Sequence, residues 1–340
     1  MIYAGLDVCL ASVSICIIDE AGLILREGIV AAEPADIAAY LAPCGTQLAR
    51  VGLEAGPMAE WIAGGLIAFG LPAVCLESRQ VKAALSAMPV KTDRNDARGI
   101  AQVVRTGWYK AVHVKSVGSQ HARTLIAARK HLVRVLTGTE QAIRGLLRPF
   151  GLKVGQVTRR VFAAQVRSLV SAHPLLASVM DPLLSAREAM MREVNRLHRL
   201  LLGVVRSDRT CHRLMTMPGI GPVTALSFRA TIDDPARFNR SRSVGPYLGL
   251  TPRRYQSGEV DRVGHITKVG DGETRTALFE AANVVLRPAT RWSPMKAWAV
   301  RLAKRQGTKR AKVALARKMA VVLHRMWRDG TEFRWTAEAA

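Results

Sequence analysis

Two aspartates that lie one helical turn apart are the first candidates for chemistry in this chain. Asp93 and Asp96 stand in the segment KTDRNDARG, among the bases Lys91, Arg94 and Arg98. Aspartates are favoured in the first turn of a helix because the helix dipole is positive there, so a plain helix start is one interpretation. Residues i and i+3 also share a helix face. The spacing therefore also fits a carboxylate pair, with the bases as phosphate contacts or charge balance.

Two further carboxylates stand where predicted strands end. Asp7 closes a strand over 2–8, and Glu54 closes a strand ending at 54. If these strands are neighbours, both side chains emerge at the edge where open α/β sheets place their sites. Carboxylates at roughly 4 Å repel by about 1–4 kcal/mol per pair, and Mg²⁺ bound through oxygen ligands would remove that cost. The alternative is that Asp7 caps a turn and Glu54 is a surface charge.

The elements that must position these acids form a β-β-β-α-β-α-β-α order. The strands are rich in Ile and Val and are separated by turn residues. Three antiparallel strands followed by α/β crossovers predict a mixed sheet with helices on its faces. The expected elements are strands 2–8, 12–18 and 23–30, helix 35–42, a strand ending at 54, helix 58–69, strand 72–77 and a helix from 93.

Charge is distributed unevenly along the chain. The formal net charge is +24, yet residues 1–100 carry −4 and residues 101–340 carry +28. A polyanionic partner is therefore expected, bound mainly by the later part. Five scattered cysteines without a CxxC pair indicate neither a disulfide framework nor a zinc site. The uncharged stretch 61–76 is short for a membrane span, and the N-terminus lacks a signal-peptide pattern, which favours the cytoplasm.

Long basic helices are predicted from about 119 to 206. Asp181 followed by Pro182 is typical of a helix start. Apolar residues then recur at coiled-coil-like spacing, which fits either a core-facing helix or an arm that forms a dimer. These residues are Leu183, Met190, Val194, Leu197, Leu201 and Val204. The last long helix is expected over 308–328.

The segment MPGIGPVTALSF at 217–228 has the spacing of a helix-hairpin-helix turn. The bare backbone at Gly219 and Gly221 can approach a phosphate, and the next helix offers its N-terminal N–H groups. A plain helix connector is the alternative. The GxGxxG pattern of dinucleotide-binding folds is incomplete because Thr224 occupies its sixth position.

A glycine-rich stretch at 247–275 surrounds the dipeptide Ser257-Gly258 with bases. Ser-Gly is a common turn dipeptide, so Ser257 is either a turn residue or a nucleophile, and Tyr255 is a rival nucleophile on chemical grounds. Five cations in this glycine-rich loop predict a phosphate-contacting surface. They are Arg253, Arg254, Arg262, Lys268 and Arg275.

Taken together, these motifs resemble a known family. GLDV, LEAG and KTDRNDA, followed by PGIGPVTA, YLGLTPRRYQSG and ITKVGDGETR, are similar to the four-carboxylate (DEDD) transposases of the IS110 class of bacterial insertion sequences, which includes the Piv-like invertases. The resemblance covers most of the chain in the same order. It implies a RuvC-like, RNase H-type N-terminal fold, Mg²⁺ (or Mn²⁺) bound by the four acids, and a covalent phosphoserine at Ser257.

The resemblance also implies a domain plan and partners. We expect a catalytic domain at 1–115, a helical coiled-coil region for dimerisation at 116–207, a mostly helical domain carrying the serine at 208–332, and a tail at 333–340. Expected partners are donor and target DNA, a structured guide RNA and further copies of the chain, as a dimer or a synaptic tetramer, in the bacterial cytoplasm. The rival readings are a water-using, metal-dependent nuclease such as a junction resolvase, and a non-catalytic scaffold, which the four acids argue against.

Overall fold

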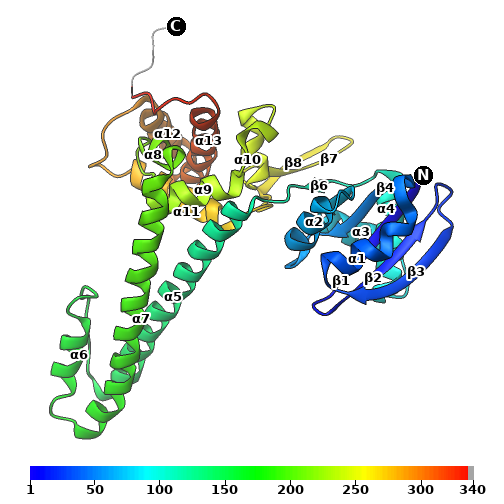
Figure 1. Cartoon of the computed structure of the whole chain (residues 1–340). Helices are drawn as coiled ribbons and strands as arrows, with labels where there is room; N and C mark the ends of the chain where they lie inside the picture. Colours follow the sequence, from blue (N-terminus) through cyan, green and yellow to red (C-terminus); the bar gives the residue numbers. More distant parts are fainter. Residues whose placement is uncertain (336–340) are drawn as a thin grey trace. The chain divides into compact units, whose positions relative to one another are not determined.

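The computed structural model describes residues 1–335 and divides the chain into two compact units, Met1–Lys115 and Ser116–Ala340 (Figure 1). Of the tail expected at 333–340, residues 336–340 lie outside the described residues. Within residues 1–335 we find no helix with the length and apolar character that crossing a membrane requires.

The first unit is a six-stranded mixed sheet with helices packed on it, as the sequence predicted. The sheet order is β3-β2-β1-β4-β5-β6, with β1, β2 and β3 antiparallel and with β4 parallel to both β1 and β5. The elements are β1 (Ile2–Val8), β2 (Ser12–Ile18), β3 (Ile24–Ala31), α1 (Pro34–Leu41), β4 (Leu48–Glu54), α2 (Ala59–Ala68), β5 (Ala73–Leu76), α3 (Ser78–Leu85), α4 (Asp93–Thr106) and β6 (Ala111–Val112).

Helix α3 and the short strand β6 are absent from the predicted order. The side chain of Glu77 caps α3 by accepting a hydrogen bond from the backbone N–H of Gln80 at 3.1 Å. A capping signal for α3 was therefore present in the sequence and was overlooked. Strand β6 has two residues, too few for any pattern to predict.

Two glycines allow α4 to lie directly against the sheet. Gly5 of β1 pairs with Gly52 of β4 in parallel register. A Cβ atom at Gly5 would lie 2.2 Å from the carbonyl oxygen of Ala97, and one at Gly52 would lie 2.1 Å from Cγ2 of Val104. Any larger residue at either glycine would push the helix away from the strands, so the glycines set how close α4 comes.

The strand alternation places Asp7 on the same face as α4. Successive side chains of a strand point to opposite faces. Ala4 and Leu6 are fully buried in the core that β1 forms with α1 and α2. Gly5 faces α4, and Asp7, two residues further, emerges on that face just past the glycine contact.

The second unit is mostly helical, as expected. Its long helices α5 and α7 pack side by side (Figure 1), and its C-terminal helices form a core together with Ala122 and Ile126 of α5 and Leu201 and Val205 of α7. The elements are α5 (Val117–Leu147), α6 (Phe162–Val170), α7 (Pro174–Ser207), α8 (Arg209–Met215), α9 (Pro222–Ile232), α10 (Val244–Tyr247), β7 (Pro252–Ser257), β8 (Val260–Ile266), α11 (Gly272–Val285), α12 (Pro294–Gln306) and α13 (Thr308–Arg328).

The helix start predicted at Asp181-Pro182 is wrong, because α7 begins at Pro174 and continues through Pro182. An interior proline costs a helix one hydrogen bond. Met180 and Leu184, on either side of it, are both buried against the end of α5 and α6, and this packing keeps the helix continuous.

The apolar seam predicted on α7 is used partly within the chain. Leu201 is fully buried and Val194 is 8% exposed, whereas Val204 is 41% exposed. Because α7 packs against α5, the buried positions belong to a core within one chain. Dimerisation through this arm stays a prediction.

Candidate active site

Four carboxylates converge where β1, β4 and α4 meet. Asp7 and Glu54 emerge from neighbouring parallel strands at the same edge of the sheet. Helix α4 begins at this edge, where Thr92 caps it by accepting a hydrogen bond from the backbone N–H of Asn95 at 3.2 Å. Its first turn carries Asp93 and Asp96. The structure thus brings together the acids that the sequence placed on three separate elements.

The pKa of the Asp7 carboxyl is affected by the other three acids. Burial raises the pKa of its carboxyl to about 6, and the negative charges of Asp93, Asp96 and Glu54 add to the rise in that order. The positive charge of Lys91 opposes it. The pKa of Asp7 therefore reflects its burial first and repulsion among the acids second, and a bound cation would offset the repulsion.

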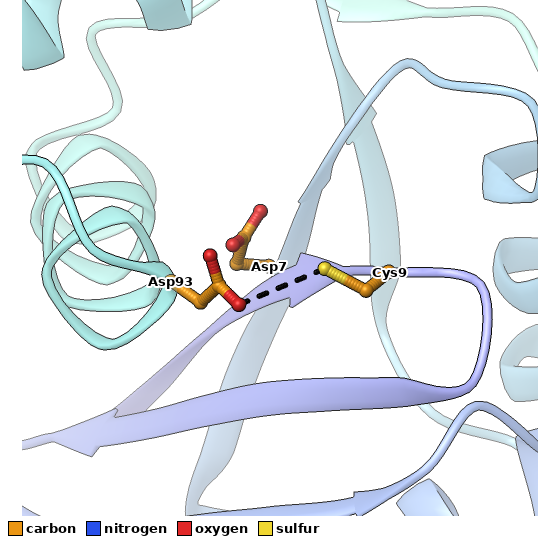
Figure 2. A group of neighbouring side chains, drawn as sticks. All are labelled: Asp7, Cys9 and Asp93. Carbon is orange, nitrogen blue, oxygen red and sulfur yellow. Dashed lines mark hydrogen bonds between the residues drawn. The ribbon is translucent and has the colours of Figure 1, made fainter.

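Cys9 also belongs to this cluster, which the sequence analysis missed. Ligand atoms of Asp7, Cys9 and Asp93 all lie within 4.8 Å of one another. The thiol of Cys9 donates a hydrogen bond to Oδ2 of Asp93 at 3.8 Å, and Figure 2 shows the side chains turned toward one another. The available signal was the spacing, because Cys9 follows Asp7 by two residues at the end of β1.

Two of the bases near the aspartates bind a different acid. Arg94 and Arg98 both donate to the carboxylate of Glu27 on β3, with Nε distances of 2.8 and 2.6 Å. These hydrogen bonds lower the pKa of Glu27 to about 2. In this structure the two arginines tie α4 to β3, and Lys91 is the base that acts on Asp7.

Ser257 lies in the second unit on a β-hairpin and not in the irregular loop that the sequence suggested. It ends β7 and pairs with Val260 of β8 across the two-residue connection Gly258-Glu259. Gly258 adopts a positive φ of 55°, which favours glycine. Every residue of β7 is exposed, so the Ser257 hydroxyl is accessible to a large substrate.

The hairpin has two chemically different faces. Tyr255 stands opposite Arg262, and directly opposed residues share a face, so both lie on the face of Ser257. By strand alternation Arg253 is on this face too. Arg254 lies on the other face, where Asp261 neutralises it through two hydrogen bonds of 2.8 and 2.6 Å.

The other predicted phosphate contacts differ in their surroundings. Arg275 donates to the carbonyl oxygens of Leu248 and Val269, both at 3.0 Å, and so braces the segment around the hairpin. Lys268 is exposed and has a positive φ of 55°.

The two glycines of the PGIGP turn also differ. A Cβ at Gly219 would lie 2.5 Å from the carbonyl oxygen of Ala281, so close packing on α11 requires glycine there. A Cβ at Gly221, the residue before α9, would meet no atom within 4 Å. Of the two, Gly221 is the one that another molecule can approach.

Comparison with known proteins shows which family the chain belongs to. A model of DEDD-type IS110 transposases matches residues 4–151, and a model described as the IS116/IS110/IS902 transposase family matches residues 211–298. The transposase of insertion sequence element IS1111A from Coxiella burnetii is 31% identical over 259 residues, which cover 75% of this chain and 71% of that protein. The chain belongs to the IS110-type family of transposases. It is therefore an enzyme of DNA strand cleavage and transfer, which excludes a non-catalytic scaffold.

Two further similarities are weaker. The pilin gene-inverting protein of Moraxella lacunata is 30% identical over 122 residues, which cover 35% of this chain and 37% of that protein. A solved structure of RuvC from Thermus thermophilus covers 33% of this chain and all of its own, at 18% identity and a TM-score of 0.26.

The donor set of this transposase fits a divalent metal. DEDD-family membership indicates such a metal, and the residues present supply hard carboxylate oxygens on a shared edge. Asp7 and Asp93 form the tight part of the set with Cys9, while Glu54 and Asp96 lie within electrostatic range of Asp7.

Proposed function

We propose that this transposase cuts and rejoins DNA through a covalent intermediate on Ser257, with Mg²⁺ (or Mn²⁺) held by Asp7, Glu54, Asp93 and Asp96. The observation that carries the proposal is the convergence of the four acids at one edge of a sheet. In this interpretation the first unit is a RuvC-like domain of RNase H type.

The proposed strand transfer needs no nucleotide cofactor as an energy source. The Ser257 oxygen loses its proton and bonds to the phosphorus of the scissile phosphodiester, and the bond to the leaving sugar oxygen breaks as that oxygen gains a proton. A strand hydroxyl then attacks the phosphoserine and releases Ser257 unchanged. The metal would stabilise negative charge on the phosphate. Because one phosphodiester replaces another, the bond energy is conserved.

Residues of the chain itself would position the DNA next to the Ser257 hydroxyl. Arg253 and Arg262, on the Ser257 face of the hairpin, would hold the DNA backbone next to the hydroxyl, together with Lys268. The Ser257 hydroxyl must reach carboxylates that belong to the other unit, from the same chain or from a second copy. We propose a homo-oligomer, a dimer or a synaptic tetramer, in which the α5–α7 arm makes the contact between copies.

Specificity is assigned to base pairing in this proposal. A structured guide RNA encoded by the element would pair with donor and target DNA, so the protein needs no base-reading helix. Purification from bacterial cells with sequencing of the bound nucleic acid tests this part. A discrete structured RNA supports it, and random fragments alone contradict it.

Ser257→Ala tests the covalent step. We expect the wild type to form an adduct with DNA that survives denaturation, and Ser257→Ala to form none. Tyr255→Phe, on the same face, serves as the matched control and should retain the adduct. An adduct in Ser257→Ala, or one mapped to Tyr255, contradicts the assignment.

A second candidate is a metal-dependent nuclease that uses water as the nucleophile. It is favoured by one observation, that the carboxylate cluster assembles entirely within the first unit. Under this candidate the wild type cleaves DNA without any adduct, and Ser257→Ala cleaves at the same rate.

A further inference from the structure

A basic hollow lies where α7 ends and α8 begins. It has a volume of about 410 Å³ and is lined by Arg206, Arg209, His212, Arg213 and Glu332. Arg206 comes from the last turn of α7, and Arg209, His212 and Arg213 come from α8, so residues of both helices line one space.

The positive charge of the hollow is not balanced nearby. In the described part of the chain, no carboxylate lies within 4 Å of the Arg206, Arg209 or Arg213 guanidinium groups. The acid closest in sequence is Asp208, which caps α8 through the backbone N–H of Cys211 at 3.0 Å and pairs with Arg229 at 2.9 Å. Because Asp208 pairs with Arg229, the three arginines that line the hollow have no ion-pair partner within 4 Å among the described residues.

Glu332 is the acid that lines the hollow, and the residue after it is held against the second unit. The next residue, Phe333, donates its backbone N–H to the hydroxyl of Thr216 at 2.9 Å and packs against the core of the second unit. Its ring also meets Trp335 edge-on at 5.3 Å. The segment after α13 is therefore tied down, and it presents a carboxylate to the arginines without forming an ion pair within 4 Å.

We propose that this hollow binds phosphate groups of the DNA backbone, and that Glu332 weakens this binding by competing with phosphate for the arginines. Guanidinium groups bind phosphate through paired N–H donors, and several of them around one space suit a polyanion better than a single carboxylate. DNA is the polyanion on which this family of enzymes acts. The site is separate from the proposed chemistry at Ser257, so the two can be tested independently.

The first test compares Arg209→Glu with Arg192→Glu in the full chain. Both arginines are exposed, and Arg192 lies on α7, about 21 Å along the helix axis from Arg206 of the hollow at about 1.5 Å per residue. Binding to a fluorescently labelled DNA duplex is followed by anisotropy at several salt concentrations in EDTA, so that no cleavage occurs.

We expect Arg209→Glu to weaken DNA binding by about 10-fold or more and to reduce the salt slope by about 1, the share of one phosphate contact. Arg192→Glu should change the affinity by less than about 2-fold, because it lies outside the hollow. Equal losses in the two variants would overturn the proposal, since they would report overall charge only. Thermal melting confirms that both variants are folded.

The second test addresses Glu332. Glu332→Gln removes the competing charge and should tighten DNA binding by about 2- to 5-fold, while Glu193→Gln on α7 should leave it unchanged. Equal tightening in both variants overturns the role given to Glu332, and so does no tightening in either. An RNA hairpin of similar length is measured in parallel, and a larger loss for RNA than for DNA in Arg209→Glu overturns the assignment to DNA.

Discussion

The carboxylate cluster and the serine hairpin are held in opposite ways. The acids stand on β1, β4 and α4, whose close packing at Gly5 and Gly52 leaves no room for even a methyl group. The hairpin β7–β8 is two strands with almost every residue exposed. A two-stranded hairpin has little stability of its own in water. The proposed metal-binding acids are therefore positioned by a packed core, whereas Ser257 stands on an exposed two-stranded hairpin.

This difference separates the expected effects of mutation. Substitutions beneath the acids should change folding as well as activity, because the acids are positioned by a buried core. Substitutions on the hairpin should change activity with little effect on folding, because the hairpin buries almost nothing.

The largest effect is expected at the acids themselves. Asp93→Asn or Asp7→Asn should reduce strand transfer on the order of 100- to 1,000-fold, since each removes charge from the proposed metal site, and should leave DNA binding intact. Asp36→Asn, at an exposed acid in the first turn of α1, is the matched control and should be neutral. A strand-transfer assay with parallel anisotropy measures both, and recombination at the wild-type rate in either site variant would remove the basis for the cluster's role.

Gly5→Ala tests whether packing holds the acids. Its methyl group would lie 2.2 Å from the Ala97 carbonyl oxygen, so α4 must move, and we expect a loss of about 2–3 kcal/mol in the free energy of unfolding. Gly64→Ala in α2 meets no atom within 4 Å and should be neutral or stabilising by up to about 1 kcal/mol. Urea unfolding of the two variants compares them; equal stabilities would show that α4 does not depend on the glycine contact.

A smaller effect on the rate of adduct formation is expected on the hairpin, where the two faces should make Arg262 and Arg254 differ. Arg262→Ala should slow formation of the Ser257 adduct by about 10-fold, because Arg262 shares a face with Ser257. Arg254→Ala should cost less than about 3-fold, because Asp261 already neutralises Arg254. Adduct yield against time on denaturing gels gives both rates. Neither variant should shift the unfolding transition, and the reverse order of the two rates would assign the DNA to the opposite face.

The smallest effect concerns Glu27, which ties β3 to α4. Its pKa is lowered from 4.5 to about 2 by Arg98 and Arg94, so its contribution to stability is full above about pH 4.5 and is lost as the pH falls toward 2. Glu27→Gln should lower stability by about 1 kcal/mol at pH 7. Urea unfolding at pH 7, 4 and 3 follows the difference between wild type and variant, which should shrink as the pH falls; a difference that grows toward acid pH contradicts this.

Much of the framework was readable from local sequence. The first three strands, the helices at 35–42, 58–69 and 308–328, and the helix that begins at Asp93 lie where turn residues and periodicity predicted them. These signals act between residues a few positions apart, so they survive in the sequence alone. The wrong prediction also came from a local signal. Pro182 indicated a helix start, but Met180 and Leu184 pack on both sides of it and the helix continues.

The family and the division of charge between an acidic start and a basic remainder could be read from the sequence alone, which also predicted the four acids and the serine as site residues. The surroundings of those residues depend on the tertiary fold. It paired β1 with β4, added Cys9 to Asp7 and Asp93, gave Arg94 and Arg98 to Glu27, and set three arginines of α7 and α8 around a hollow beside Glu332. Contacts between residues so far apart in the chain depend on how whole elements pack, which no local pattern records.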